Sequence, residues 1–374
     1  MIFADAKKYT KSRDKVLVLI SDTGPSRLMM NILESTIEAN LEPHVIIYDS
    51  KRTKLFDDIT AIGISCEYME YSGNRSSLAL ILKTIRHIKA NSYRIVYASG
   101  QHATLLGISA AFIARAPKRI FTRHHSDSNF YGYGTSIRLI RGYLFDVFFN
   151  WLATDIAAVS KVVKDQMIEH EFVNSNKIVV INNSVSDDFQ IEHRKFREGD
   201  RLKIGVISRL TGLKGVKFAS EAFAKYYEVN NNCELTVVGE ESDSAKDVRQ
   251  VLSHLPQSSY QFITKLSDTK AFYSDIDLFV HVPIRETAEA FGLVYLEALF
   301  SGVHCIFTKS GIISADEELT KFCKVVNFED SNAILKEIIA FANQDSDVKE
   351  LPREIIERYS PEKMKDSYKE LWLS

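Results

Sequence analysis

The chain has 374 residues, of which 45% are hydrophobic and 26% are charged, a composition typical of soluble globular proteins rather than disordered ones. A single hydrophobic core rarely grows beyond about 250–300 residues, so the length predicts two domains. The formal net charge of -2 lacks the basic excess of a nucleic-acid-binding protein, and we expect no nucleic acid as a partner.

The cysteines indicate a reducing compartment. They have neither C-x-x-C spacing nor an accompanying histidine cluster, so the patterns for structural zinc and for disulfides are both weak. The four are Cys66, Cys233, Cys305 and Cys323. The first 15 residues are polar and charged, unlike a secretory signal, and no apolar run reaches the roughly 18 residues of a membrane span. We therefore expect a cytoplasmic protein, at most peripheral to the inner face of a membrane.

The first half begins with a strand, a loop, a helix and a strand. Residues 16–20 (VLVLI) form a continuous apolar run, which is typical of a buried parallel strand. They are followed by turn residues at 21–26, which include Gly24, by an amphipathic stretch at 27–40 and by a second apolar run at 45–48. This order predicts a βαβ unit.

The same alternation continues to the end of the first half. It predicts strands at residues 95–98, 118–122, 156–159 and 178–181, and a helix at 103–114. We place the first domain at residues 1–190. The stretch from Tyr131 to Trp151 is rich in aromatic residues with Arg138 and Arg141 interspersed. We interpret it as a core helix. The alternative is contact with a lipid-linked acceptor at a membrane surface.

Residues 191–202 are charged and lack periodicity, which is typical of a linker between domains. The pattern of strands and helices then starts again and predicts a second domain at residues 203–358, with strands at 203–207, 235–239, 278–280 and 303–307. Ligands of such sheets bind at the carboxyl ends of the strands. Two doubly wound parallel sheets therefore predict a ligand-binding cleft between the domains.

The last segment, residues 359–374, is predicted to be a helix. Ser360 is a favourable N-cap, Pro361 suits the first helical position, and Glu362 complements the helix dipole.

The strongest functional signal is the sequence EAFGLVYLE, which runs from Glu289 to Glu297 and opens a helix after a strand. The free N–H groups of a first helical turn bind anions, and Gly292 allows a ligand to approach the backbone closely. Ionised carboxylates accept hydrogen bonds from sugar diols. The segment thus matches the layout of a nucleoside diphosphate sugar. The alternative is a helix with a solvated glutamate at each end.

A second signal, SRLTGLKG, follows the first strand of the second domain. Its two cations, Arg209 and Lys214, lie where a strand ends, so they can neutralise a diphosphate. The alternative for these two residues is an ordinary pair of solvated loop charges.

A third signal is the sequence TRHHSD, which runs from Thr122 to Asp127 and contains His124 and His125 at a strand end. The spacing does not predict a metal site, and a lone histidine is more often structural. A separate D-x-D pattern at Asp275 and Asp277 precedes a strand. We interpret it as a helix cap or a corner, and we expect no essential metal.

These segments resemble glycosyltransferase family 4, a retaining family with the GT-B fold of two Rossmann-like domains. The two glutamates match the family's E-x7-E motif. The resemblance implies that Glu289 lies near the donor sugar, that Glu297 holds the nucleotide ribose, and that the amides of Phe291 and Gly292 face the diphosphate.

The other segments also have counterparts in the family. Arg209 and Lys214 match the phosphate-binding pair of G-R-L-x-x-x-K-G, with Ser208 in place of the usual glycine. His124 matches the histidine that faces the donor sugar, although a register shift of one residue would select His125. Gly24 matches the glycine loop after the first strand, where the family often has a second glycine.

The resemblance covers nearly the whole chain and implies that the last helix crosses back to the first domain. It implies transfer of a sugar from a nucleotide diphosphate sugar to a hydroxyl of a glycan or lipid-linked acceptor, with retention, in cell-surface polysaccharide or glycolipid biosynthesis. We expect no cofactor beyond this co-substrate. The alternatives are a nucleotide-sugar epimerase of the same fold and an inactive nucleotide-sugar-binding scaffold subunit. A dehydrogenase is disfavoured because no strand ends in G-x-G-x-x-G.

Overall fold

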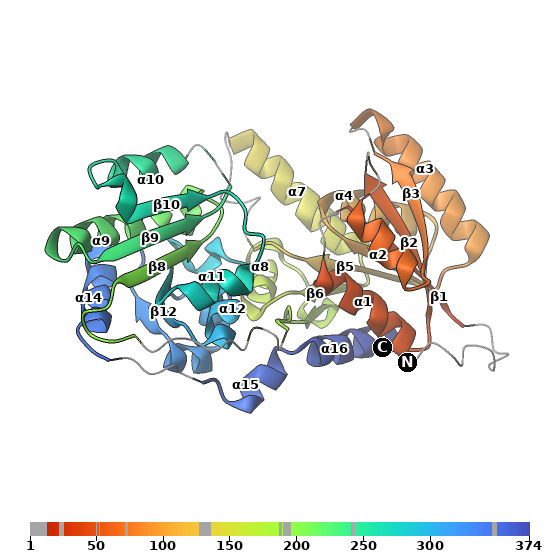
Figure 1. Ribbon diagram of the computed structural model, residues 1–374. Coiled ribbons are helices and arrows are strands. Elements are labelled where there is room, and N and C mark those ends of the chain that lie inside the picture. Colours follow the sequence, from red (N-terminus) through yellow and green to blue (C-terminus); the bar gives the residue numbers. More distant parts are fainter. Residues whose placement is uncertain are drawn as a thin grey trace.

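A computed structural model describes residues 13–21, 26–49, 51, 53–71, 74–126, 136–186, 189, 196–240, 242, 244–345 and 350–374. It contains two domains, each built on a parallel sheet (Figure 1). The predicted fold class, two tandem doubly wound α/β domains, is confirmed. Gly24 and residues 191–195 of the expected linker lie outside the described residues.

The first sheet has seven strands in the order β3-β2-β1-β4-β5-β6-β7, and every pair is parallel. The order reverses at β1 and β4, which is the switch point where doubly wound sheets bind ligands. The strands are β1 (Lys15–Ile20), β2 (Glu42–Asp49), β3 (Ser65–Glu70), β4 (Ile95–Ser99), β5 (Lys118–Arg123), β6 (Asp155–Ala158) and β7 (Ile178–Val180).

Helices cover both faces of this sheet because successive strand residues point to opposite sides. Val16 and Val18 pack beneath one set of helices, whereas Leu17 and Leu19 belong to the core on the other side. The helical segments are α1 (Arg27–Glu38), α2 (Lys54–Ala61), α3 (Asn74–Asn91), α4 (Gln101–Ala103), the π-helical turn η1 (Thr104–Ile108), α5 (Ser109–Ile113), α7 (Ser136–Leu152), α8 (Lys161–Glu171) and the short turn η2 (Ser175–Lys177).

The second sheet has six strands in the order β10-β9-β8-β11-β12-β13, again all parallel. The strands are β8 (Leu202–Ile207), β9 (Cys233–Val238), β10 (Tyr260–Ile263), β11 (Leu278–His281), β12 (His304–Thr308) and β13 (Lys324–Val326). The helices are α9 (Val216–Val229), α10 (Ala245–Leu252), α11 (Thr269–Asp275), α12 (Leu293–Ser301), α13 (Ile312–Ala315), α14 (Ser331–Ala342), α15 (Arg353–Arg358) and α16 (Pro361–Leu373). Short turns are η4 (Gly212–Lys214), η5 (Gln257–Ser259), η6 (Glu286–Ala288) and η7 (Glu317–Phe322).

The expected C-terminal helix is α16, and it packs on the first domain beside α1 (Figure 1). The Ser360 side chain caps it by accepting a hydrogen bond from the Lys363 N–H at 3.2 Å. Trp372 is buried, and its indole N–H donates to the Ser35 hydroxyl of α1 at 2.9 Å. The end of the chain is thereby tied to its first helix.

The segment expected to be a core helix around residues 131–151 differs from that interpretation. Residues 131–135 lie outside the described residues, and α7 buries one stripe, with Phe149 and Leu152, against the sheet. The opposite side of α7 leaves aromatic side chains exposed, among them Trp151 at 63%. Aromatic content predicts an apolar helix but does not determine how much of its surface is covered. In the part of the chain that is described, no helix has both the length and the apolarity to cross a membrane.

Candidate active site

The Glu289 carboxylate lies at the centre of a buried polar cluster in the second domain. The Lys214 ammonium is 2.6 Å from its Oε1 atom, and His281, the last residue of β11, donates from Nε2 to the same oxygen at 3.0 Å. Lys214 also donates to the carbonyl of Ala288 at 2.8 Å. The structure therefore brings together Lys214 and Glu289, which the sequence placed in separate motifs.

Two glycines allow the segments that carry Lys214 and Glu289 to pack this closely. Gly215 has φ +66°, and a Cβ atom there would lie 1.8 Å from the carbonyl oxygen of Val282, so no other residue fits without a shift of the backbone. The turn that carries Lys214 can thus lie directly against the end of β11. On the other side, a Cβ atom at Gly311 would lie 2.8 Å from the Cβ of Glu289.

The ionisation of Glu289 follows from these contacts. Burial by itself raises the pKa of the carboxyl, but the hydrogen bond from His281 and the charge of Lys214 outweigh burial and lower the pKa to about 2. Glu289 is therefore a carboxylate at neutral pH, fixed at the carboxyl end of β11. An oriented carboxylate accepts hydrogen bonds from hydroxyl groups.

Glu297 lies one turn into α12 and has different surroundings. Burial raises its pKa to about 7, and the hydroxyl of Tyr273, which donates to the carboxylate at 3.4 Å, offsets this rise only in part. A group that is half protonated near neutral pH can gain or lose its proton when a ligand binds.

The remaining predicted residues of the second domain follow β8 or precede α12. Phe291 is buried, and Gly292 has φ +82° as the residue before α12. Arg209 follows β8, is exposed, and has no ion pair with another described residue. A long cation of this kind can turn towards an anion at the start of α12.

Two serine hydroxyls of the first domain hold the segment that carries Glu289. Ser126 donates to the carbonyl of Thr287 at 2.5 Å, and Ser160, the N-cap of α8, donates to the carbonyl of Ala290 at 2.5 Å. The two carbonyls lie on either side of Glu289 in the sequence. The carboxylate thus lies where the two domains meet, the place at which the two parallel sheets predicted a ligand-binding cleft.

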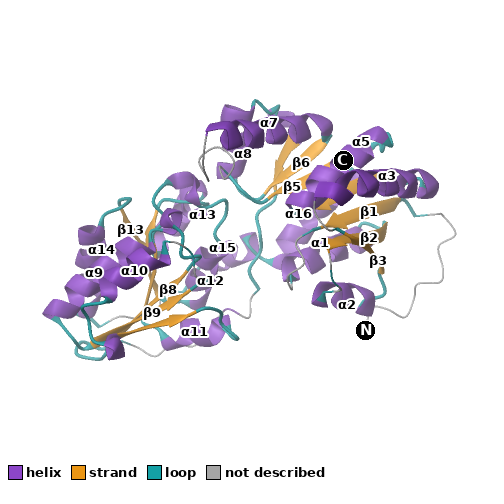
Figure 2. Cartoon of the chain, turned by 90° about the horizontal axis from the view of Figure 1, so that it is seen from above, coloured by secondary structure: helices purple, strands orange, loops and turns teal. Residues whose placement is uncertain are grey.

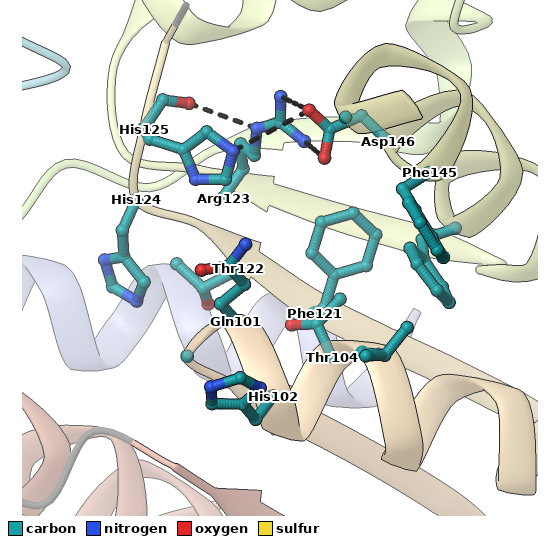
Figure 3. A pocket seen from close by; sticks show the side chains of 14 residues that line it. Gln101, His102, Thr104, Phe121, Thr122, Arg123, His124, His125, Phe145 and Asp146 are labelled. Carbon is teal, nitrogen blue, oxygen red and sulfur yellow. Dashed lines mark hydrogen bonds and ion pairs between the residues drawn. The ribbon is translucent and has the colours of Figure 1, made fainter. Parts of the chain in front are cut away.

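The paired histidines diverge at the end of β5 (Figure 3). His124 is exposed, and its Nε2 atom is 3.2 Å from the hydroxyl of Ser99 at the end of β4. His125 turns the other way, with its Nε2 atom 3.9 Å from Asp146 of α7. The geometry favours His124 over His125 as the residue that faces a ligand at the sheet edge.

Arg123, the last residue of β5, has a structural role. Its guanidinium is buried and pairs with Asp146 at 2.9 Å and with Glu171 at 2.5 Å, and Asn150 donates to the other oxygen of Glu171 at 2.6 Å. Burial raises the pKa of Glu171, whereas the charge of Arg123 lowers it. The network ties β5 to α7 and α8.

A cavity of about 360 Å³ lies between β5, α7 and the π-helical turn (Figure 3). His124 lies at one end and Phe145 at the other, and Phe149 also lines the cavity. A π-helical turn in its wall is a feature that often marks functional sites.

The D-x-D pattern lies away from this region. Asp277 accepts the backbone N–H of Lys203 at 2.9 Å, and Asp275 pairs with the Lys203 ammonium at 2.6 Å. Both precede β11, whereas Glu289 follows it, so the pattern is at the opposite end of the strand. Within the described ranges, one group of His, Cys, Asp and Glu side chains is compact enough for a metal ion, His44 with Glu67 and His87, in β2, β3 and α3.

Two family models match consecutive parts of the sequence. Residues 23–189 match the model described as "Glycosyltransferase Family 4", and residues 188–359 match "Glycosyl transferases group 1". The chain belongs to glycosyltransferase family 4. The matches favour a transferase over the epimerase that we considered as an alternative.

Similar proteins agree with this assignment. The glycosyltransferase is 28% identical, over 352 residues, to the capsular polysaccharide biosynthesis glycosyltransferase CapM of Staphylococcus aureus, covering 88% of this chain and 87% of that protein. The HepE protein of Anabaena, solved with UDP and glucose, has a TM-score of 0.73 at 18% identity and covers 97% of this chain and 100% of its own. The lipopolysaccharide outer core galactosyltransferase WaaB has a TM-score of 0.70 at 14% identity, covering 96% and 99%. Both structures share the GT-B fold with this glycosyltransferase.

Sequence reasoning missed several polar residues of the glycosyltransferase's cleft. His281 is the one ionisable residue in the strand LFVH and stands at its carboxyl end, which was a usable signal. Ser126 stands in the TRHHSD segment and Ser160 follows the strand at 156–159, but their contacts were not predicted, because their partners are 161 and 130 residues away in the sequence.

Proposed function

We propose that this glycosyltransferase moves a glycosyl group from a nucleotide diphosphate sugar to a hydroxyl of a glycan or lipid-linked acceptor, with retention at the anomeric carbon. The observation that supports the proposal best is the buried Lys214–Glu289 pair beside the start of α12. It combines a cation for the diphosphate with a carboxylate for the sugar hydroxyls at one place in the cleft.

In the proposed reaction, the bond from the anomeric carbon to the diphosphate oxygen breaks, and the acceptor oxygen bonds to the same face of that carbon. The acceptor proton passes to the departing phosphate oxygen. Lys214, Arg209 and the N–H groups near Phe291 stabilise the negative charge that develops on the diphosphate. Glu289 and His124 hold the sugar.

The name of CapM and the ligands of HepE direct the first experiments. UDP-glucose is the first donor to test because HepE is solved in complex with it, and synthesis of a cell-surface polysaccharide is the process that CapM's name indicates. Thermal-shift measurements with UDP, GDP, ADP and their sugars identify the donor, since a ligand of the native state raises the melting temperature. NMR of the product's anomeric proton tests retention, and an inverted product would contradict the proposal.

We expect Glu297→Gln to weaken UDP binding in a pH-dependent manner. A ribose diol donates hydrogen bonds to the ionised carboxylate, so binding favours loss of the proton from a group whose pKa is about 7. Affinity of the unchanged protein should therefore rise as pH increases from 6 to 8. At pH 8 the variant should bind about 10- to 100-fold more weakly, the equivalent of about 1.5–3 kcal/mol.

Calorimetry at both pH values measures this effect. The matched control is Glu354→Gln, an exposed carboxylate on α15. Equal affinity of the Glu297→Gln variant and the unchanged protein at pH 8 would remove Glu297 from the ribose site.

We also propose that transfer needs no metal ion. The carboxylates of the D-x-D pattern pair with Lys203, and two cations with a helix start are available for the diphosphate in place of a metal. After EDTA treatment, turnover with UDP-glucose should stay within about twofold of the untreated protein's turnover. Removal of a group that stabilises the developing charge would instead lower turnover by about 10²–10³-fold. Abolished turnover that Mg²⁺ or Mn²⁺ restores would contradict this, and the metal's ligands would then be sought by substituting Asp275 and Asp277.

A further inference from the structure

The first domain exposes a continuous apolar surface, which we name the α5–α7 face. Its members are large apolar side chains that are 41–63% exposed: Phe112, Ile113, Leu144, Phe145, Phe148 and Trp151. A ring contact joins the two helices, because the ring centres of Trp151 in α7 and Phe112 in α5 are 5.4 Å apart. Within α7, the ring centres of Trp151 and Phe148 are 6.4 Å apart. Figure 2 shows α5 and α7 along an outer edge of the first domain. Large clustered apolar patches of this kind mark interaction sites.

Cations border this face at the end near Trp151. The Arg119 guanidinium lies 5.6 Å from the ring centre of Phe112, and Lys177 donates to the carbonyl of Ala153, just beyond α7. Arg115 is exposed two residues after α5. The one α7 carboxylate, Asp146, is turned inward to Arg123. Apolar side chains edged by cations match the interface of a bilayer that contains anionic lipid.

The face is continuous with the cavity beside the cleft. Phe145 is half exposed on the face and also lines the cavity, together with Leu105 and Phe149. At the other end of the cavity is His124 (Figure 3), two residues before Ser126, whose hydroxyl donates to the carbonyl of Thr287, two residues before Glu289. The cavity therefore has a polar side at His124 and an apolar side at Phe145, which belongs to the face.

We infer that the α5–α7 face docks on an anionic bilayer and that the cavity receives the sugar headgroup of a lipid-linked acceptor, whose tail passes Phe145 into that bilayer. The acceptor part rests on the proposed function, whereas docking does not. The apolar end of the cavity suits a lipid tail better than a hydroxyl-rich glycan, since burying apolar surface against a hydrocarbon removes more of it from water.

Sedimentation with lipid vesicles tests the docking. The probes are vesicles of phosphatidylcholine with and without phosphatidylglycerol, and the variant carries Phe148→Glu and Trp151→Glu. We expect the unchanged protein to bind the anionic vesicles, and the variant to bind at least about tenfold more weakly, because it loses two interfacial aromatic side chains and gains repulsion. The matched control is Val229→Glu, a 77% exposed position at the end of α9 in the second domain.

Several outcomes decide the matter. Equal binding of variant and unchanged protein, binding that ignores phosphatidylglycerol, or concentration-dependent self-association through the face without vesicle binding would each overturn docking. If the glutamate variant has a lowered melting temperature, the milder double substitution Phe148→Gln with Trp151→Gln replaces it in the same measurement.

A rate measurement tests the acceptor. We expect the variant's rate on a vesicle-borne acceptor to fall more than its rate on a short soluble acceptor. Equal falls overturn the acceptor assignment, whereas no transfer to either acceptor by the unchanged protein refutes the proposed function and leaves the vesicle result standing.

Discussion

Replacing Lys214 with methionine is expected to lower the turnover of the donor by about 10²–10³-fold, the usual cost of losing one preorganised charge stabiliser. The Lys214 ammonium is almost fully buried, and its position is set by Glu289 at 2.6 Å and by the carbonyl of Ala288. Such a cation needs no reorganisation when charge develops on a diphosphate. Methionine keeps most of the side-chain volume, so the turn against β11 is preserved.

The same substitution should change the pH dependence of the residual activity. Without the charge of Lys214, the pKa of Glu289 should rise from about 2 towards the ordinary value of 4.5. A sugar site that needs the carboxylate then loses activity as pH falls from about 5.5 towards about 4, whereas the unchanged protein, with its pKa of about 2, keeps Glu289 ionised over that range. Steady-state rates at several pH values measure both effects.

Lys217→Met is the matched control, because Lys217 is half exposed on α9, three residues further along the chain. The melting temperature of each variant shows whether the fold survives. Combining Lys214→Met with Arg209→Ala tests the shared role, since two residues that act on one diphosphate lose less together than the product of their separate losses. Turnover of Lys214→Met within about twofold of the unchanged protein would exclude the lysine from the reaction.

Glu289→Gln should lower turnover by a similar factor of about 10²–10³ while leaving the affinity for UDP unchanged. UDP lacks the sugar, and the glutamine side chain still offers a carbonyl oxygen to the Lys214 ammonium, which the carbonyl of Ala288 also holds in place for the diphosphate. This separates Glu289 from Lys214, whose replacement should weaken UDP binding and turnover together. Calorimetry with UDP and rate measurements with the donor distinguish the two patterns.

The substitution should also alter acid stability. Because the pKa of Glu289 is lowered from 4.5 to about 2, its ionised form contributes stability that is fully present above pH 4.5 and is lost as pH falls towards 2. The glutamine variant lacks this contribution and leaves Lys214 buried without its carboxylate, which costs stability at neutral pH. The difference in unfolding free energy between the unchanged protein and the Glu289→Gln variant should therefore become smaller as pH falls from 4.5 towards 2.

Glu286→Gln is the control for both experiments, because Glu286 is exposed in the same segment and accepts a hydrogen bond from Ser314. Loss of UDP affinity in Glu289→Gln equal to the loss of turnover would mean that the residue supports the nucleotide site as a whole. That result would contradict a specific role at the sugar.

The local signals in the sequence were sufficient for the fold, and they named the candidate site residues, whose roles stay predictions. Continuous apolar runs such as residues 16–20 predicted buried parallel strands, since only a strand covered on both faces lacks polar alternation. The Ser360–Pro361 pair predicted the start of α16, because capping depends on neighbouring residues alone. The spacing of Glu289 and Glu297 likewise identified a helix start at a strand end.

Only the tertiary structure decided how these pieces meet. The contacts of Glu289 with His281 and Lys214, and the serine hydroxyls that reach its segment from the first domain, join residues far apart in the chain, and no local pattern specifies them. The divergence of His124 and His125 depends on which neighbour, Ser99 or Asp146, each imidazole finds. The exposed side of α7 was equally beyond the sequence, because apolar content predicts that a helix can be buried, whereas the packing of other elements determines which of its stripes is covered.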